Sequence, residues 1–262
     1  MALDANFAQV KHSTSWSPEM LLADHSALLS IILHLLPGLV TGAVAVALLP
    51  AVVAARYPAH VALVLSIPLA MIPMQLGLLL YLGYKRNGRL SLQGVVLYRQ
   101  PIQLRKYLVY VPLVFMLSLA VIGIGGAVLD NTLRKTLFAW MASFDWNNAG
   151  GFTRAVLVVS YSLTLLFVTL GESAVEELYF RGFLLPRMRY AGRGATILHS
   201  FLFALYHVWQ PWRLISIAFG MLPIVFAVRR TRNIYVGMIA HMLLNSYDVI
   251  LGVAFILAMT VR

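Results

Sequence analysis

The sequence predicts an all-α protein, a polytopic bundle of about seven or eight transmembrane helices, some of them short or broken around a buried polar site. Hydrophobic residues make up 61% of the 262 residues and charged residues only 11%, with a mean hydropathy of +0.83. This apolar share exceeds that of an ordinary soluble domain. The apolar residues fall into long runs of the length that crosses a bilayer as a helix. Basic residues gather in the short segments between the runs.

Four long apolar runs predict spanning helices, of which the first three form a scaffold and the fourth contains a charged motif. These runs cover residues 27–55, 60–84, 107–129 and 155–185. Shorter pieces follow at 195–208 and 214–228, and we expect them to pack inside the bundle because such pieces seldom span alone. The last run, 234–261, predicts one long helix or two short ones broken near Tyr247 and Asp248.

The domain organisation is simple. Residues 1–26 form a mixed, polar N-terminal segment without the pattern of a signal peptide, so we expect this segment to be retained. Residues 27–262 are predicted to form a single membrane-embedded domain, because no soluble stretch is long enough to bury a core of its own. Cysteine is absent, which excludes a thiolate metal site and a cysteine nucleophile.

The net charge of +11 comes from basic clusters in loops. The main clusters lie at 85–106, 187–193 and 229–232. If the spans alternate, all three clusters fall on one side, which the positive-inside rule makes cytoplasmic. We therefore expect an integral multi-pass membrane protein, in the inner membrane if the source is prokaryotic. No single aromatic-rich basic face is present, so the lipid bilayer is expected as a partner and nucleic acid is not.

The stretch "GESAVEELYFRGF", residues 171–183, places charged side chains at membrane depth. A charge at the centre of a spanning helix costs at least about 2.5 to 3.5 kcal/mol, so such groups face the bundle interior and often mark function. Glu172 and Glu176 share one helix face, and Glu177 shares another with Arg181. We interpret Glu177 and Arg181 as a charge pair. Glu176 has no obvious cation and suits a group that takes up and returns a proton.

Two later segments add polar side chains at the same helical spacing. "FALYHVWQPW" places Phe203 and His207 one turn apart, and "HMLLN" does the same for His241 and Asn245. With Glu176, these residues supply a general base, a proton partner and two donors for a developing oxyanion. The set is sufficient for cleaving an amide bond with water.

These three segments resemble those of a known family. "EELYFR" matches E-E-x-x-x-R, "FALYH" matches F-x-x-x-H and "HMLLN" matches H-x-x-x-N, in the order found in the CPBP family (CAAX protease and bacteriocin-processing, Abi) of intramembrane proteases, which includes the type II CAAX prenyl endopeptidases. The resemblance covers roughly the last hundred residues, with the motifs in 171–246, whereas the first 150 residues match only as generic spans.

The resemblance implies a glutamate-type intramembrane endopeptidase that acts on a membrane-anchored peptide or protein. It implies that Glu176 and His207 activate the attacking water, and that His241 and Asn245 stabilise the tetrahedral oxyanion. It also implies that Glu177 and Arg181 support the site. We further expect Glu172 and Phe203 to be supporting residues. Two readings of Glu172 stay open, a proton-sharing pair with Glu176 or a position near the membrane edge. No cofactor is expected, and the oligomeric state is not predicted.

Three alternative functions remain. Glu176, His207 and His241 form a possible zinc set with an open position for water, although H-E-x-x-H is missing and Asn245 suits hydrogen bonding better than zinc. A proton-coupled transporter would use the same groups as a relay, but the sequence shows no inverted repeats. The third alternative is a non-catalytic membrane scaffold.

A few polar and aromatic residues outside the motifs carry weaker expectations. His34 and His199 are interpreted as hydrogen-bonded packing residues, and Asp248 as a residue at a helix end or interface. We expect four aromatic residues to form an interfacial belt near the mouth of the site. They are Tyr179, Tyr206, Trp209 and Trp212.

Overall fold

The structure, a computed structural model, describes residues 17–141 and 150–259. It confirms the predicted helical bundle: six helices in these ranges are long and apolar enough to cross a membrane. The chain is thus an integral multi-pass membrane protein. Residues 1–16 of the predicted polar segment 1–26 lie outside the described residues. The last two residues of the predicted run 234–261 also lie outside them. The described part of the segment contains a short helix, α1 (Pro18–Leu22).

Several spans are composite helices in which π-helical turns interrupt the α-helix. The helices are α2 (Ala27–Ala54), α3 (His60–Ser66), α4 (Ile72–Asn87), α5 (Leu104–Gly125), α6 (Asn131–Lys135), α7 (Arg154–Leu163), α8 (Ser173–Glu176), α9 (Ala195–Tyr206), α10 (Leu214–Thr231) and α11 (Ile234–Ala258). The π-helical segments are Ile67–Met71, Gly126–Asp130, Thr164–Glu172 and Glu177–Leu184, and the 3₁₀ helices are Ala139–Met141, Leu185–Arg187, Arg189–Gly194 and Pro211–Arg213. The last run is therefore one helix, α11.

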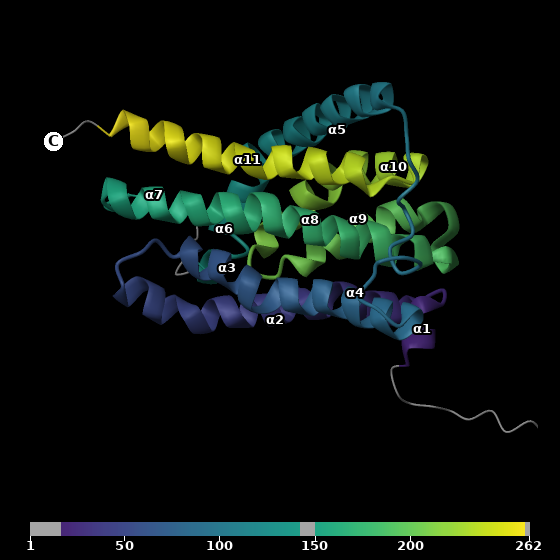
Figure 1. The fold of residues 1–262 in the computed structure, drawn as a ribbon. Coiled ribbons are helices and arrows are strands. Elements are labelled where there is room, and N and C mark those ends of the chain that lie inside the picture. The colour runs from purple at the N-terminus through teal and green to yellow at the C-terminus, as the bar shows by residue number, and fades with distance from the viewer. Residues whose placement is uncertain (1–16, 142–149, 260–262) are drawn as a thin grey trace, which may run out of the picture.

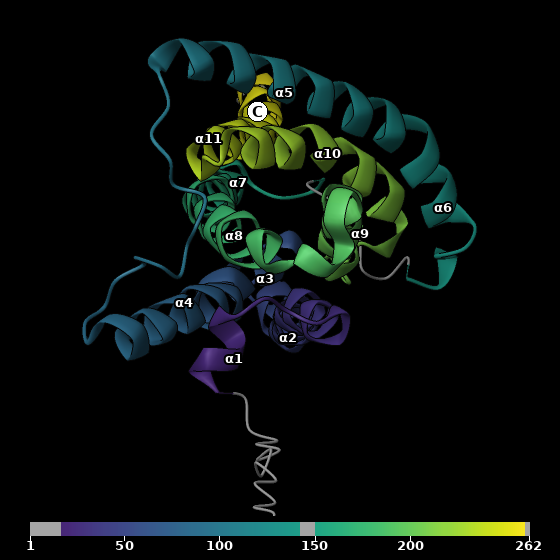
Figure 2. The same cartoon turned by 90° about the vertical axis from the view of Figure 1, so that its right-hand side faces the viewer.

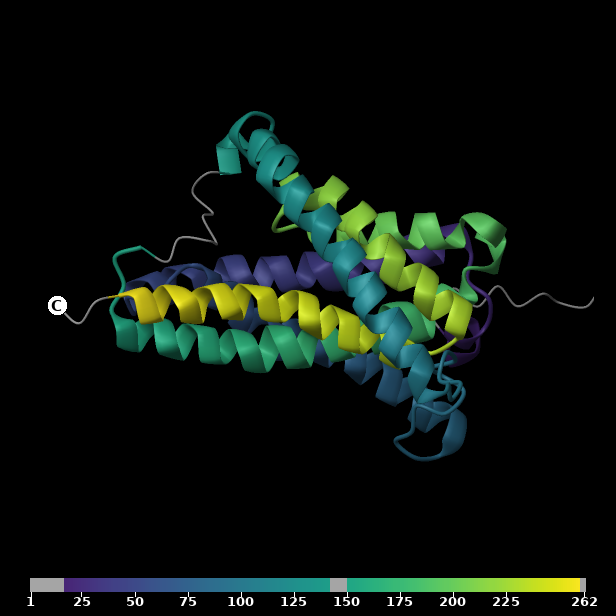
Figure 3. The same ribbon diagram turned by 90° about the horizontal axis from the view of Figure 1, so that it is seen from above.

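The long helices lie side by side, with α5 crossing them (Figure 1). Seen end-on, α2 and α4 form one side of the bundle, α5 covers the opposite side, and α8, α9 and α10 lie between them (Figure 2). Seen from above, α5 runs obliquely over α10 and α11 (Figure 3). Helix α10 packs most extensively against α5 and α9. The middle of the bundle thus contains α8 and α9, which carry Glu176 and Phe203 of the motifs.

Helices α9 and α10 form a hairpin whose connecting turn lies inside the bundle. Helix α9 has 12 residues, a length of about 18 Å at 1.5 Å per residue, whereas a bilayer core is about 30 Å thick. The chain after α9 turns through residues 207–213 and returns along α9 as α10. The structure therefore agrees with the prediction that the piece at 195–208 is too short to span, whereas α10 with the turn before it, Pro211–Thr231, is longer than predicted and is one of the six helices that could cross a membrane. The structure places His207 at the tip of the hairpin, directly after α9.

Helix α2 approaches α9 closely because it presents small residues at the contact. A Cβ atom at Gly38 would overlap the backbone carbonyl of Tyr206, and one at Gly42 would lie 3.1 Å from the side chain of Val208. Small residues allow two membrane helices to approach closely. The contact holds the end of α9, and hence His207, against the scaffold.

The expected aromatic belt is wrong. Tyr179, Tyr206, Trp209 and Trp212 are all buried, with at most 7% of their surface exposed. The turn of the hairpin folds into the protein, so Trp209 and Trp212, which lie in this turn, are buried. The Tyr206 hydroxyl accepts a hydrogen bond from Nε2 of Gln75 at 3.2 Å, and the Tyr179 hydroxyl donates to the Leu33 carbonyl at 2.8 Å.

Candidate active site

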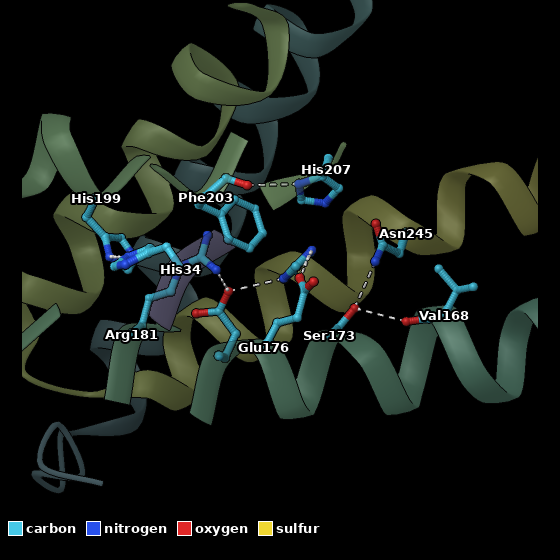
Figure 4. Close-up of polar contacts among 11 residues, drawn as sticks. His34, Val168, Ser173, Glu176, Arg181, His199, Phe203, His207 and Asn245 are labelled. Atoms are coloured by element: carbon cyan, nitrogen blue, oxygen red, sulfur yellow. Dashed lines mark hydrogen bonds and ion pairs between the residues drawn. The ribbon is translucent and has the colours of Figure 1, made fainter. Parts of the chain in front are cut away.

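Three parts of the chain bring the motif residues together in the middle of the bundle (Figure 4). The composite helix that contains α7 and α8 carries Glu172, Glu176, Glu177 and Arg181. The hairpin tip carries His207, and α11 carries His241 and Asn245. Glu176 lies between two π-helical segments, a form of helix that is rare and often occurs at functional sites. The α-helical spacing in the sequence does not reveal these π segments.

Glu177 and Arg181 form the expected charge pair, and both side chains are completely buried. Nη1 of Arg181 lies 3.4 Å from Oε1 of Glu177. The Arg181 guanidinium also stacks on Phe203, with 3.9 Å between its Cζ atom and the ring centroid, a cation–π contact. The F-x-x-x-H phenylalanine thus packs against the cation that balances Glu177.

Glu177 has a second partner that the sequence analysis did not foresee. Nδ1 of His241 lies 3.1 Å from the same Oε1 atom. This contact requires α11 to pass very close to Glu177, and Gly237, one turn before His241, permits it. A Cβ atom at Gly237 would lie 2.5 Å from Oε2 of Glu177. Glu177 therefore links Arg181 on its own helix to His241 on α11.

The hydrogen-bond partners define which nitrogen of each histidine faces the site. Nδ1 of His207 lies 2.9 Å from the Phe203 carbonyl, which can only accept, so Nδ1 donates and Nε2 carries a lone pair in the neutral ring. Nδ1 of His241 donates to the Glu177 carboxylate in the same way. Nε2 of His241 then faces Glu176, 3.9 Å from its Oε2 atom.

Glu176 is buried and its two carboxylate oxygens have no hydrogen-bond partner among the described residues. Glu172, Glu176 and His207 each offer one atom to a cluster in which all atoms lie within 4.8 Å of one another. Glu172 is therefore buried beside Glu176 rather than at the membrane edge, with a carboxylate oxygen of each within 4.8 Å of the other. The sequence left this point open.

A cavity of about 390 Å³ connects these groups. Its lining includes all four residues expected to be catalytic, together with Glu172: they are Glu172, Glu176, His207, His241 and Asn245. Glu177, Arg181 and Phe203 do not line it and lie behind Glu176 and His241. A substrate in the cavity would thus meet Glu176 and the two histidines, whereas the charge pair would act through them.

Asn245 has a local partner that the motifs did not indicate. Its Nδ2 atom donates to Oγ of Ser173 at 3.0 Å, and Ser173 is fully buried. An amide has two N–H groups, so one remains for the cavity that Asn245 lines. Thr169 donates to the Asn245 backbone carbonyl at 3.3 Å. Ser173 and Thr169 are polar residues in the same apolar run as Glu176, which is the only signal that the sequence contains for them.

The donor atoms in the cavity include groups that suit a metal ion. The zinc set expected from the sequence is Glu176, His207 and His241, whereas the structure brings Glu172, Glu176 and His207 together. His241 instead uses Nδ1 for Glu177. Two carboxylates and one imidazole are donors that zinc accepts, so the residues are compatible with a bound zinc ion at this place.

Two expectations outside the motifs have different outcomes. His34 and His199 are buried and hydrogen-bond to each other, with 3.0 Å between Nε2 of His34 and Nδ1 of His199; Nδ1 of His34 donates to the Ser30 carbonyl at 2.6 Å. They are hydrogen-bonded packing residues, as expected. Asp248 lies within α11 and lines the cavity, so of its two expected places the helix end is wrong, and the interface stays a prediction. The helix continues through it because α11 is unbroken.

Residues 158–247 match the family model described as type II CAAX prenyl endopeptidase Rce1-like. The matched segment contains every predicted site residue and confirms the resemblance inferred from the three motifs. Such a domain implies a protease, that is, a peptide hydrolase. No curated protein and no solved structure matches the chain.

Replacement of Glu177 should destabilise the protein. Glu177→Gln removes the charge that faces both Arg181 and His241 and leaves a buried, unpaired guanidinium, a change that typically costs about 3 to 5 kcal/mol. We expect a clearly lower melting temperature in detergent and a lower yield of folded protein. Glu172→Gln is the matched control, since Glu172 is a buried carboxyl group on the same helix without an ion pair among the described residues; it should melt close to the wild type. Equal melting temperatures for Glu177→Gln and the wild type would contradict the structural role of the pair.

Proposed function

We propose that the protein is a glutamate-type intramembrane endopeptidase that hydrolyses a peptide bond in a membrane-anchored peptide or protein, since residues 158–247 match the Rce1-like family model. The observation that carries this proposal is the convergence of Glu176, His207, His241 and Asn245 on one buried cavity. A carboxylate without a cation of its own, next to an imidazole lone pair, is a suitable pair for removing a proton from water.

In the proposed reaction, Glu176 and His207 hold the attacking water. Nε2 of His207 presents a lone pair because Nδ1 is bound to the Phe203 carbonyl. Glu176 takes one proton from the water as the oxygen attacks the substrate carbonyl carbon. It then passes this proton to the leaving amine as the tetrahedral intermediate collapses. Glu176 therefore takes up one proton and returns it within each reaction cycle.

The oxyanion is stabilised from α11. His241 donates from Nε2 only when its ring is protonated, because Nδ1 is bound to Glu177. The carboxylate of Glu177 fixes the orientation of the His241 ring and keeps Nε2 directed to the cavity, as the buried carboxylate orients the histidine of a Ser-His-Asp triad. Asn245 contributes its second N–H group. Donors of this kind, held in a water-poor site, are among the largest contributions to catalysis.

Loss of the Glu176 base should abolish most of the activity. Glu176→Gln keeps the size of the side chain but cannot accept a proton, so turnover of a membrane-anchored reporter peptide should fall by about 10² or more. Its melting temperature should stay near that of the wild type, because Glu176 is not part of the Glu177–Arg181 pair. The assay is product accumulation by pure protein in detergent. If folded Glu176→Gln cleaved the reporter as fast as the wild type, Glu176 would not be the general base. If the wild-type protein yielded no product, a transporter or a scaffold would be favoured.

We propose that the reaction needs no metal ion, because Glu176 and the lone pair of His207 can remove a proton from water without one, and Asn245 acts as a hydrogen-bond donor in the cavity. Treatment with a strong zinc chelator followed by desalting should leave kcat and KM unchanged. Elemental analysis should find far less than one metal ion per chain. If activity is lost and zinc alone restores it, the cluster of Glu172, Glu176 and His207 is a catalytic metal site.

The direction of the cavity suggests how a substrate enters. Beyond Glu172 the cavity is lined by His60, Tyr161 and Leu251, which belong to the end of the bundle where α3 and α7 begin and α11 finishes (Figure 1). The basic clusters lie at the other end. We propose that the basic end is cytoplasmic, as the positive-inside rule indicates. The substrate then reaches Glu176 from the non-cytoplasmic side.

A single cysteine tests this direction without background, because the chain has no cysteine. Asp248→Cys, in the cavity, should react with a membrane-impermeant maleimide added to the outside of intact cells. Leu243→Cys is the control on the same helix, because Leu243 is 42% exposed and does not line the cavity; we expect its side chain to face lipid. It should stay unlabelled. Labelling of Asp248→Cys only after cell lysis would reverse the orientation, and no labelling at all would refute an open cavity.

A further inference from the structure

A second and larger cavity, of about 690 Å³, lies at the basic end of the bundle, away from the candidate active site. It is formed between the start of α9 and the end of α10. Four arginines and three apolar residues account for all but one of its lining residues: they are Arg193, Arg229, Arg230, Arg232, Ile197, Leu222 and Phe226. The remaining residue is Thr196. No carboxylate lines the cavity.

Arg229 is held in place by hydrogen bonds, whereas the other three arginines, Arg193, Arg230 and Arg232, are exposed. Arg229 donates to the Gly192 carbonyl at 2.7 Å and to Oγ1 of Thr196 at 2.9 Å. These partners are neutral, so they orient the guanidinium without cancelling its charge. Within the described ranges, none of the four arginines forms an ion pair with a carboxylate. The cavity therefore concentrates positive charge for which the described part of the chain supplies no carboxylate partner.

The apolar side of the cavity faces outward. Ile197 is 55% exposed and Phe226 is 61% exposed, and both project from helices that lie within the membrane-embedded bundle. Charged residues at a helix end and apolar residues further along the same helices match the two parts of a phospholipid, an anionic head group and an acyl chain. A soluble anion would use the arginines alone. Basic pockets between transmembrane helices on the cytoplasmic side are suited to anionic lipid head groups.

We propose that this cavity binds an anionic phospholipid, with the phosphate group at Arg193, Arg230 and Arg232 and an acyl chain along Ile197 and Phe226. The guanidinium groups donate charge-assisted hydrogen bonds to the phosphate oxygens. The bound lipid bridges the first turn of α9 and the last turn of α10, the two open ends of the hairpin that carries His207. This proposal does not depend on proteolytic activity.

The test is the thermal stability of the purified full-length protein in detergent. Phosphatidylglycerol should raise the melting temperature in a saturable manner. Phosphatidylcholine with the same acyl chains should have little effect, and so should glycerol phosphate, which offers the head group without a tail. An equal shift with glycerol phosphate would indicate a soluble-anion site and overturn the lipid proposal, and an equal shift with phosphatidylcholine would overturn the role of charge.

Two variants of equal charge separate a specific site from general surface charge. Arg230→Gln combined with Arg232→Asn removes two cavity arginines, and asparagine suits the left-handed backbone conformation of residue 232, whose φ is 49°. The lipid concentration for half-maximal stabilisation should rise by about tenfold or more, because each arginine near an anionic lipid surface strengthens binding by about fivefold. Arg89→Gln with Arg105→Gln removes two exposed arginines outside the cavity and should leave that concentration unchanged. Equal effects of the two pairs would overturn the proposed site. Melting temperatures without lipid show whether each variant folds.

Discussion

The buried pair of Arg181 and Glu177 is the interaction on which the geometry of the candidate site depends. Taking two ions out of water costs several kcal/mol each, and only close partners offset that cost. Glu177 meets the requirement from two directions, through Arg181 one turn along its own helix and through His241 on α11. Phe203 covers the guanidinium from α9. Three separate elements are thereby joined at one buried charge.

This linkage explains why the two adjacent glutamates have different positions. Glu177 faces Arg181 and lies behind the cavity, whereas Glu176 lines the cavity, about 100° further round the helix. Glu176 is therefore left without an ion pair to Arg181, in reach of both histidines. The hairpin of α9 and α10 completes the site because α9 is too short to cross the membrane and ends with His207 in the interior. The space beyond the hairpin tip is the cavity.

Much of this arrangement can be predicted from the sequence. The i, i+4 spacings placed Glu177 with Arg181, Glu172 with Glu176, and His241 with Asn245, since side chains one turn apart on a helix share a face. The apolar runs predicted the spans and the short hairpin helices. These features are local, and a helix fixes local geometry wherever it packs.

The contacts between elements could not be predicted in this way, because they depend on how each helix is rotated and how closely it approaches its neighbour. The bond from His241 to Glu177 needs the close approach at Gly237, and the bond from Asn245 to Ser173 needs the same alignment of α11 with α8. The proximity of Glu172 to His207 depends on how far the hairpin of α9 and α10 extends into the bundle. The aromatic belt was mispredicted for the same reason, since Trp209 and Trp212 follow the hairpin turn into the core.

The central claim is that Glu177 acts by holding His241 rather than by taking part in the reaction itself. A double-mutant cycle on kcat/KM tests it most directly, with Glu177→Gln, His241→Gln and the double variant assayed on one reporter peptide in one detergent, and folded fractions determined for each. If the claim is right, Glu177→Gln lowers kcat/KM strongly in the wild-type background but has little further effect once His241 is replaced. The coupling energy between the two substitutions should then exceed about 0.5 kcal/mol, the limit within which the effects of independent sites are additive. The claim would be contradicted if Glu177→Gln lowered kcat/KM by the same factor in the His241→Gln background as in the wild type.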